Sequence, residues 1–192
     1  MKADAIILRK LQIEDLEAYE RLTHPSKAFH RFNGPYFKKE TAEDLGEKMK
    51  AWRCNFLSGN LAFIEQRMVI TALETKELIG EVSWYWKSQE TDWMEVGIVI
   101  FNEAYWGKGI GMIALKRWID LVFESFPQLV RIGLTTWSGN VRMMGLAEKL
   151  GMKKEAVYRK ARIVEGDYYD SVSYGVLKAE WLDHWNNHVT GE

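Results

Sequence analysis

Apolar residues recur along the chain with two periods, which predict helices and strands in a definite order. A period of 3.6 residues predicts helices at 13–22, 41–56, 112–126 and 140–150. Alternating or β-branched runs predict strands at 5–9, 61–73, 78–86, 93–101, 130–137, 157–164 and 168–177. The order β-α-α-β-β-β-α-β-α-β-β implies a mixed, largely antiparallel sheet with one βαβ unit.

Local signals support several of these boundaries. Thr41-Ala42-Glu43-Asp44 is typical of a capping box, with a hydroxyl at the N-cap and a carboxylate three residues later. Gly151 follows the helix at 140–150 as its expected C′ residue. Glu165-Gly166-Asp167 predicts the turn of the last hairpin. The aromatic segment 29–36 is too apolar for a solvated loop, and we expect it to wall a substrate pocket.

The connection between the strand at 93–101 and the helix that follows is rich in glycine. Gly107, Gly109 and Gly111 allow the backbone to approach an anion closely, and the helix N-terminus directs free N–H groups at it. This pattern predicts a pyrophosphate-binding turn, although its spacing also fits a connection that binds nothing. Met112 replaces the third glycine of a dinucleotide fingerprint, and Asn102 replaces the first glycine of a Walker loop.

Length, composition and charge narrow the class of protein. With 192 residues, 47% of them apolar, the chain fits one compact domain, and its net charge of −1 disfavours nucleic-acid binding. Cys54 is the only cysteine, so no intrachain disulfide can form. The apolar run at 5–8 is too short for a signal peptide or a membrane span. We therefore expect a soluble, cytoplasmic protein. His184 and His188 have helical spacing but no flanking acid, so we do not expect them to bind zinc.

Four segments carry a resemblance to a known family. Trp106-Gly107-Lys108-Gly109-Ile110-Gly111 resembles the acetyl-CoA motif of GCN5-related N-acetyltransferases (GNAT), with Trp106 in the usual Gln or Arg place. The segment 95–100 resembles the fourth strand of that family, and 140–152 resembles its segment from an Asn to "KLGF". The segment 165–172 resembles the "NGxYxD" hairpin of the RimJ/RimL-like branch, which includes the ribosomal-protein alanine N-acetyltransferases.

The resemblance implies a fold and an activity. The fold is α/β in the sense of a mixed sheet: six to seven mostly antiparallel strands flanked by helices, with a central βαβ acetyl-CoA-binding unit, in one N-acetyltransferase domain spanning 1–192. The implied reaction transfers an acetyl group from acetyl-CoA to a primary amine, by direct attack on the thioester and without a metal. Two alternatives remain: a non-catalytic acyl-CoA-binding or regulatory module, and an interaction domain that uses some of the nine tryptophans.

The resemblance also assigns residues to the cofactor. Backbone groups of the strand end would pair with the pantetheine arm, the glycine loop would cradle the pyrophosphate, and Asn140 would bond the pantetheine besides capping its helix. Lys108 would add a charge-assisted contact, unless it is merely solvated. The implied cofactor-binding residues are Val99, Ile100, Phe101, Gly107, Lys108, Gly109, Ile110, Gly111, Met112 and Asn140.

Glu95 is the first candidate for the general base that deprotonates the amine, and Glu81 on the neighbouring strand is the second. A water-relayed base and two solvent-facing glutamates are the alternatives. Ala147 stands where many family members have a tyrosine general acid, and Met143 where relatives often have Ser. A thiol pKa of about 8.5 allows the thiolate to leave without a donor, or with one such as water or Tyr168.

The acceptor amine is less determined than the cofactor. At neutral pH, deprotonation of an α-amine with a pKa of about 8 costs about 3 kcal/mol less than deprotonation of a lysine side chain with a pKa near 10.4. A weak base therefore favours an N-terminal acceptor. Ribosomal-protein N-termini, polyamines, aminoglycosides and amino acids all remain open, as does assembly into a homodimer.

Overall fold

The computed structural model describes residues 5–189 and their side chains through residue 185. The strands of the described chain are β1 (Ile6–Arg9), β2 (Arg67–Ala72), β3 (Leu78–Ser88), β4 (Trp93–Ile100), β5 (Arg131–Trp137), β6 (Lys153–Val164) and β7 (Asp167–Leu177). The helices are α1 (Leu16–Thr23), α2 (Ala42–Ser58), α3 (Ile110–Ser125), α4 (Val141–Lys149) and α5 (Lys178–Val189). Short 3₁₀ segments lie at η2 (Ile13–Asp15), η3 (Ala28–Arg31), η4 (Ala62–Ile64) and η5 (Glu103–Tyr105).

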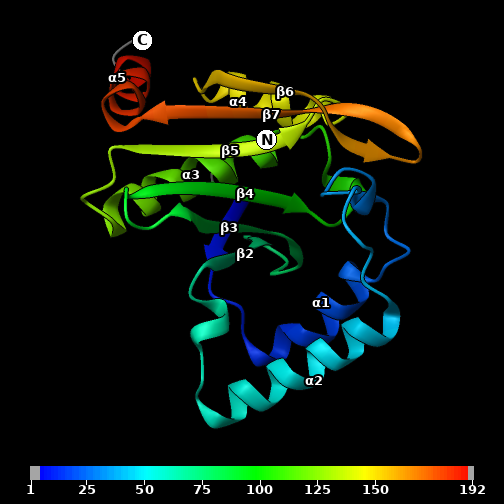
Figure 1. The fold of residues 1–192 in the computed structure, drawn as a ribbon. Helices are drawn as coiled ribbons and strands as arrows, with labels where there is room; N and C mark the ends of the chain where they lie inside the picture. The colour runs from blue at the N-terminus through cyan, green and yellow to red at the C-terminus, as the bar shows by residue number, and fades with distance from the viewer. Residues whose placement is uncertain (1–4, 190–192) are drawn as a thin grey trace. The chain divides into compact units, whose positions relative to one another are not determined.

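The strands form one mixed sheet in the order β1-β2-β3-β4-β5-β7-β6 (Figure 1). β4 and β5 run parallel, whereas β1–β2, β2–β3, β5–β7 and β6–β7 are antiparallel. The parallel pair requires a crossover connection, which here contains the glycine loop and α3. The predicted mixed, mostly antiparallel sheet with a central βαβ unit is confirmed.

The chain divides into two compact units. The first comprises residues up to Ser83 together with 98–114, and the second comprises 84–97 together with residues from Leu115 onward. β3 and β4 each contribute residues to both units.

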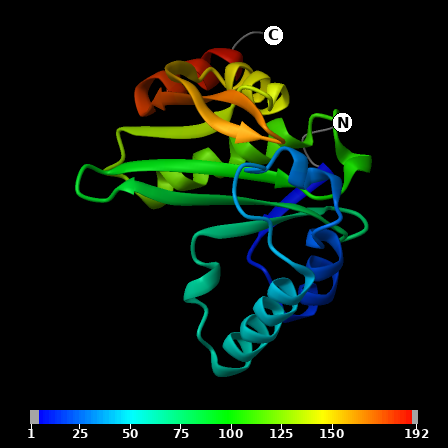
Figure 2. The same ribbon diagram turned by 45° about the vertical axis from the view of Figure 1, so that its right-hand side comes forward.

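Residues of α1 and α2 form much of the core of the first unit, together with residues of β2 and β3. The two helices run side by side in two views (Figures 1 and 2). The buried residues of this core are Leu11, Leu16, Tyr19, Phe29, Leu45, Met49, Trp52, Ile64, Val69, Leu78 and Phe101. The predicted capping box of α2 is confirmed, because the Thr41 N–H donates to Asp44 Oδ2 at 2.9 Å and the Asp44 N–H donates to Thr41 Oγ1 at 3.1 Å. Each of these residues thus satisfies one backbone donor at the helix start.

Two predicted boundaries in the first unit were wrong. The strand predicted at 61–73 begins only at Arg67, because Ala62–Ile64 forms a 3₁₀ turn that buries Ile64 in the core. The helix predicted from Met112 begins at Ile110. Gly109 acts as its N-cap residue, since its carbonyl accepts from the N–H groups of Met112 and Ile113 at 3.1 and 3.2 Å.

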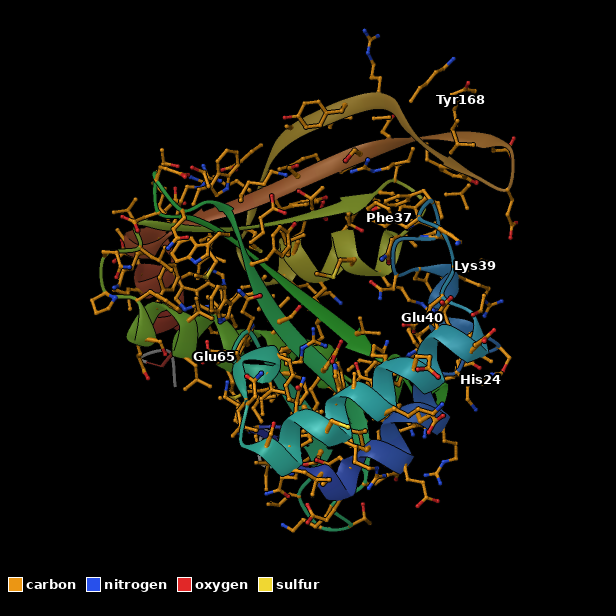
Figure 3. All side chains as sticks on the ribbon, turned by 60° about the horizontal axis from the view of Figure 1, so that its bottom comes forward. His24, Phe37, Lys39, Glu40, Glu65 and Tyr168 are labelled. Carbon is orange, nitrogen blue, oxygen red and sulfur yellow. The ribbon has the colours of Figure 1, made fainter. Side chains whose placement is uncertain are left out.

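The second unit contains the hairpin and helices of the C-terminal half. β6 and β7 pair across the predicted turn, and Tyr168 lies near that turn with an exposed side chain (Figure 3). β6 begins at Lys153, four residues earlier than predicted. The sequence did not predict α5, whose Trp181 indole donates to Asp120 on α3 at 2.8 Å. Gly151 has the left-handed backbone expected of a C′ residue, with φ +79°.

Candidate active site

The glycine loop meets α3 in a conformation that suits a bound anion. Gly107 and Gly109 have φ values of +71° and +79°, which L side chains rarely adopt. Both glycines are exposed, and a Cβ built on either would meet nothing within 4 Å. As N-cap residue Gly109 has no side chain to cap the helix, so the first amides of α3, at Ile110 and Gly111, have neither an intrahelical acceptor nor a side-chain cap from Gly109. This arrangement of open space and helix N-terminus fits a phosphate group.

Trp106 ties the glycine loop to the end of β4. Its indole Nε1 donates to the Ile100 carbonyl at 2.9 Å, and its ring packs edge-on against Phe32 with centroids 5.7 Å apart. Phe32 belongs to the aromatic segment 29–36, so that segment contacts the loop. A tryptophan in the usual Gln or Arg place therefore has a structural function here, which is to hold the loop against the strand.

The end of β4 presents alternate backbone groups to β3. The Phe101 N–H donates to the Ile79 carbonyl at 2.9 Å, and a Cβ built on Gly80 would lie 2.1 Å from the Val99 carbonyl oxygen. Backbone groups of successive strand residues point to opposite edges. Val99 and Phe101 therefore face β3, and Ile100 faces the other edge.

Lys108 is exposed, with Nζ 5.8 Å from the centre of the Tyr105 ring. Tyr105 donates its hydroxyl to Glu77 Oε2 at 2.7 Å, and this hydrogen bond raises the pKa of Tyr105 above its ordinary value. The exposure of Lys108 fits both predicted alternatives, a charge-assisted contact with a ligand and simple solvation.

Asn140 is the N-cap of α4, as predicted. Its Oδ1 accepts from the Met143 N–H at 3.1 Å, and its own N–H donates to the Trp137 carbonyl at 2.9 Å. A ligand acceptor would engage the amide nitrogen, because it is the donor group of this side chain.

Glu95 is buried, with 3% of its surface exposed, so the solvent-facing alternative is wrong for this residue. Its Oε2 accepts a hydrogen bond from the Tyr85 hydroxyl, and its Oε1 accepts from Thr135 Oγ1 at 3.0 Å. Lys87 Nζ lies 3.8 Å from Oε1, and Thr135 is hydrogen-bonded to Ser173 at 3.0 Å. Two hydroxyl donors and a cation thus provide this buried carboxylate with polar partners and hold it in place.

Glu95 also marks the end of the parallel ladder. In the described chain the β4–β5 register comprises Met94 with Ile132 and Glu95 with Gly133, although β5 continues to Trp137. In the described chain, the backbone of β5 beyond Gly133 therefore pairs only with β7. This pairing continues as far as Trp137, which lies opposite Ser171. The carboxylate lies where the two parallel strands stop pairing.

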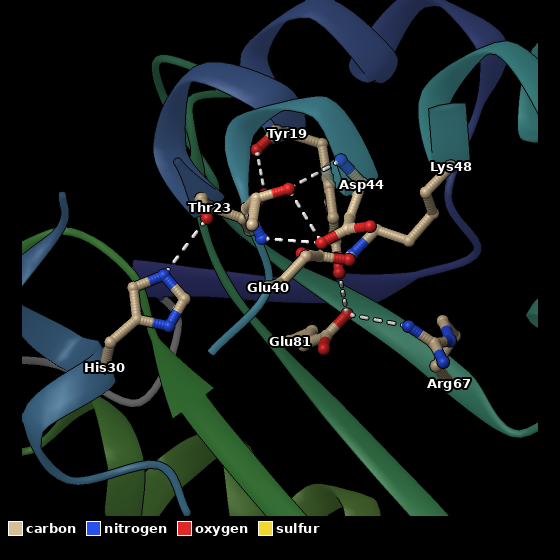
Figure 4. A network of polar contacts seen from close by, with 9 residues as sticks. Tyr19, Thr23, His30, Glu40, Asp44, Lys48, Arg67 and Glu81 are labelled. Atoms are coloured by element: carbon tan, nitrogen blue, oxygen red, sulfur yellow. Dashed lines mark hydrogen bonds and ion pairs between the residues drawn. The ribbon is translucent and has the colours of Figure 1, made fainter. Parts of the chain in front are cut away.

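Glu81, the second candidate base, belongs to another network (Figure 4). Its Oε2 accepts from the Tyr19 hydroxyl at 2.9 Å and lies 3.4 Å from Arg67 Nη1. Burial and the neighbouring Glu81 charge raise the pKa of Tyr19 well above its ordinary value. This glutamate holds α1 to the sheet, which is a sufficient structural reason for its presence.

Two of the three positions that depart from the family pattern, Ala147 and Met143, offer no general acid. Ala147 is fully buried and has no ionisable group, and Met143 contributes only its backbone N–H to the Asn140 cap. Of the hairpin tyrosines, Tyr168 is 62% exposed. Tyr174 is buried and donates to Glu148 Oε1 at 3.0 Å; burial first, and then this bond, raises its pKa to about 12.

Sequence reasoning missed Tyr85 and Thr135 as hydrogen-bond partners of Glu95, and Ser173 as the partner of Thr135. A signal was present on β3, where Glu81, Ser83, Tyr85 and Lys87 occupy every second position and so share one face. The pairing of β5 with β4 and β7, which brings Thr135 to Glu95 and Ser173 to Thr135, cannot be predicted from a local sequence pattern.

Four of the nine tryptophans lie in the core. The buried residues are Trp52, Trp118, Trp137 and Trp181, so these tryptophans belong to the core rather than to a partner surface.

Among the described residues, no group of three or more His, Cys, Asp or Glu side chains could hold a metal ion. The side chain of His188 lies outside the described residues. No described helix has both the length and the apolar character needed to cross a membrane.

Comparison with known proteins identifies the family. The family model for the acetyltransferase (GNAT) domain matches residues 5–153, and the chain belongs to this family. YoaA, an uncharacterized N-acetyltransferase of Bacillus subtilis, is 30% identical over 182 residues, which cover 93% of this chain and 96% of YoaA. YdaF of the same organism, a putative ribosomal N-acetyltransferase, is 32% identical over 104 residues, which cover 54% of this chain and 56% of YdaF.

Solved structures agree on the fold. The spermidine N-acetyltransferase of Vibrio cholerae, solved in complex with CoA and spermine, superposes with a TM-score of 0.72 at 22% identity and covers 93% of this chain and 98% of its own. The predicted GNAT fold is confirmed. The chain is an N-acetyltransferase, whose cosubstrate in this family is acetyl-CoA and whose second substrate is an amine.

Proposed function

We propose that this protein acetylates an N-terminal α-amine of a protein, or a small primary amine, by direct attack of the amine on the thioester of acetyl-CoA. The observation that carries the proposal is the pair of exposed, left-handed glycines at the N-terminus of α3. Open space in front of a helix N-terminus suits the phosphate groups of a cosubstrate.

Each predicted cofactor residue has a distinct contribution in this proposal. Backbone amides from Gly107 to Gly111 bind the pyrophosphate, Met112 closes the first turn of α3 through its N–H on the Gly109 carbonyl, and Lys108 adds a charge-assisted contact. At the end of β4, Ile100 supplies the backbone N–H for the pantetheine arm, because Val99 and Phe101 present their backbone groups to β3. Those two residues keep the strand end in place, and Asn140 offers its amide nitrogen to a pantetheine oxygen.

Glu95 is the proposed base. Its contacts with Tyr85, Thr135 and Lys87 hold the buried carboxylate in one position, which suits a group that must meet the acceptor amine in a defined geometry. Because the site has no general acid at Ala147, the thiolate leaves unprotonated, and a thiol pKa of about 8.5 makes this departure tolerable.

An N-terminal α-amine is the preferred acceptor class. The free-energy cost for a carboxylate base to remove a proton is about 3 kcal/mol lower for an α-amine than for an amine with a pKa near 10.4. The similarity to YdaF, a putative ribosomal N-acetyltransferase, supports the same choice. Spermidine, the substrate named for the Vibrio cholerae enzyme, is the natural competing acceptor for a test.

The test is release of the CoA thiol by the purified chain with acetyl-CoA and a panel of amines. The panel comprises a hexapeptide with a free N-terminal alanine, its N-acetylated form as a matched blank, spermidine and free alanine. We expect release above the blank, with a higher kcat/KM for the free peptide than for spermidine. Tight acetyl-CoA binding without release for any amine would favour the non-catalytic acyl-CoA-binding module instead.

A further inference from the structure

Three charged side chains lie on the strands around Glu95. In the second unit β3, β4 and β5, all of whose residues are described, carry Lys87, Glu95 and Arg131 as their charged residues. Arg131 is bound to Glu155 on β6, and this ion pair lies against Gly175 on β7. Lys87 Nζ lies 3.8 Å from Glu95 Oε1. Glu95 is therefore the one carboxylate on this part of β3 to β5, and a cation already accompanies it.

Lys87 acts on Glu95 through its charge rather than through a hydrogen bond, because 3.8 Å is too long for an N–H···O contact. The Lys87 side chain is 45% exposed, whereas that of Glu95 is 4% exposed. A partly solvated cation thus lies beside a buried carboxylate. The field of this cation is weaker than in a dry interior, but it is screened less than that of a charge in bulk water.

An acceptor amine that gives its proton directly to Glu95 must come close to Lys87, whatever its direction of approach. A carboxylate offers about four lone-pair sites, and the hydroxyls of Tyr85 and Thr135 use two of them. A nitrogen that bonds Glu95 Oε1 at about 3 Å lies no more than about 7 Å from Lys87 Nζ. Over such distances Lys87 repels a further positive charge on the acceptor and attracts a negative one.

We propose that Lys87 is a specificity-determining residue, which selects acceptors with a neutral or negative group beside the reacting amine and disfavours polycationic amines. This inference rests on the proposed function. A polyamine such as spermidine brings a second ammonium group, which Lys87 repels and for which β3 to β5 of the second unit offer no carboxylate besides Glu95. A peptide N-terminus brings one positive charge and loses it before the attack. A carboxylate next to that N-terminus gains from Lys87.

The experiment uses acetyl-CoA and three hexapeptides with a free N-terminal alanine, which differ only in having Asp, Asn or Lys as the second residue. Consecutive Cα atoms are 3.8 Å apart, so the second side chain stays within about 10 Å of the α-amine. In the wild type we expect kcat/KM to be about threefold to tenfold higher for the Asp peptide than for the Lys peptide, with the Asn peptide between them.

Variants at Lys87 show whether this residue causes the preference. Lys87→Gln should bring the ratio of the Asp to the Lys peptide to about one, and Lys87→Glu should invert it, because the repelled charge changes sign. The ratio cancels any general loss of activity that follows when Glu95 loses its neighbouring cation. Lys87→Arg keeps the charge and should keep the ratio. Lys149→Glu, at an exposed position on α4, makes the same change in net charge and is the matched control.

Salt provides a second readout in the wild type. At an ionic strength of about 1 M the Debye length falls to about 3 Å, so the ratio should approach one. A wild-type ratio at or below one in dilute buffer, or a ratio that Lys87→Gln leaves unchanged, would overturn the selection by Lys87 alone. A wild type that releases no thiol with any amine would overturn the proposed function and this inference together. If Lys87→Glu is inactive or does not fold, the comparison of Lys87→Gln with Lys87→Arg decides the question.

Discussion

Gly80 shows how a single residue fixes the strand that leads to the proposed cofactor site. A Cβ at this position would lie 2.1 Å from the Val99 carbonyl oxygen and 3.0 Å from the Ile100 Cα. Both neighbours are backbone atoms, so no side chain can rotate away to relieve the overlap. The close approach of β3 and β4 at this point therefore requires glycine.

Gly80→Ala should destabilise the protein by about 1–3 kcal/mol or more, the usual cost of overpacking. Gly46→Ala is the matched control, because Gly46 lies inside α2 and a Cβ there meets nothing within 4 Å. Removing a glycine from a helix interior should stabilise by about 0.5–1 kcal/mol. Urea denaturation measures both, and a Gly80→Ala midpoint at or above that of the wild type would show that the strands can separate there.

The residue scale also shows where prediction from sequence ends. The sequence indicated that Glu95 was a candidate base, but strand alternation could not indicate its burial. Burial depends on Thr135, which is 40 residues away in sequence, and on the exposed Tyr85. Such contacts follow from strand pairing, which a single sequence does not specify locally.

At the scale of elements, α4 has one N-cap residue with two proposed functions. Asn140 caps the helix through Oδ1, whereas the proposed pantetheine contact uses the amide nitrogen. The two functions therefore rest on different atoms and can be separated by substitution.

Asn140→Asp keeps the capping oxygen and removes the donor, and Asn140→Ala removes both. We expect Asn140→Ala to lose about 1 kcal/mol of stability and Asn140→Asp to lose little. Both variants should bind acetyl-CoA about threefold to tenfold more weakly, the value of one hydrogen bond. Denaturation and calorimetric titration provide the two readouts. Wild-type acetyl-CoA affinity in Asn140→Asp would leave the cap as the sole function of this residue.

Elements with a strong local signal could be predicted, and elements held by tertiary contacts could not. The capping box at Thr41 and the turn at 165–166 depend on neighbouring residues alone. The 3₁₀ turn at Ala62–Ile64 was predicted as strand because a short apolar run has no distinguishing period. The residue before α5 is Leu177, which has no side-chain oxygen to cap the helix, although its N–H donates to Glu180 Oε2 at 3.1 Å. The anchor of α5, Trp181 on Asp120, is a contact over 61 residues.

At the scale of the whole molecule, the family resemblance predicted more of the fold and the activity than any single motif did. The glycine loop alone fitted several readings, but the ordered segments at 95–100, 107–112 and 140–152 indicated the GNAT family, which the domain match confirms. A single domain over 1–192 stays a prediction. The central claim is that the loop from Gly107 to Met112 holds the pyrophosphate of acetyl-CoA.

Calorimetric titration of acetyl-CoA into Gly109→Trp, beside the wild type and Gly59→Trp, tests that claim most directly. Gly59 is the matched control, since it is also exposed, has φ +73° and meets nothing within 4 Å of a built Cβ, but it ends α2. Both substitutions cost similar backbone strain. We predict that Gly109→Trp weakens acetyl-CoA binding at least about 100-fold, because the side chain fills the space of the pyrophosphate, while Gly59→Trp binds as the wild type does. Equal acetyl-CoA affinity in Gly109→Trp and the wild type would contradict the account.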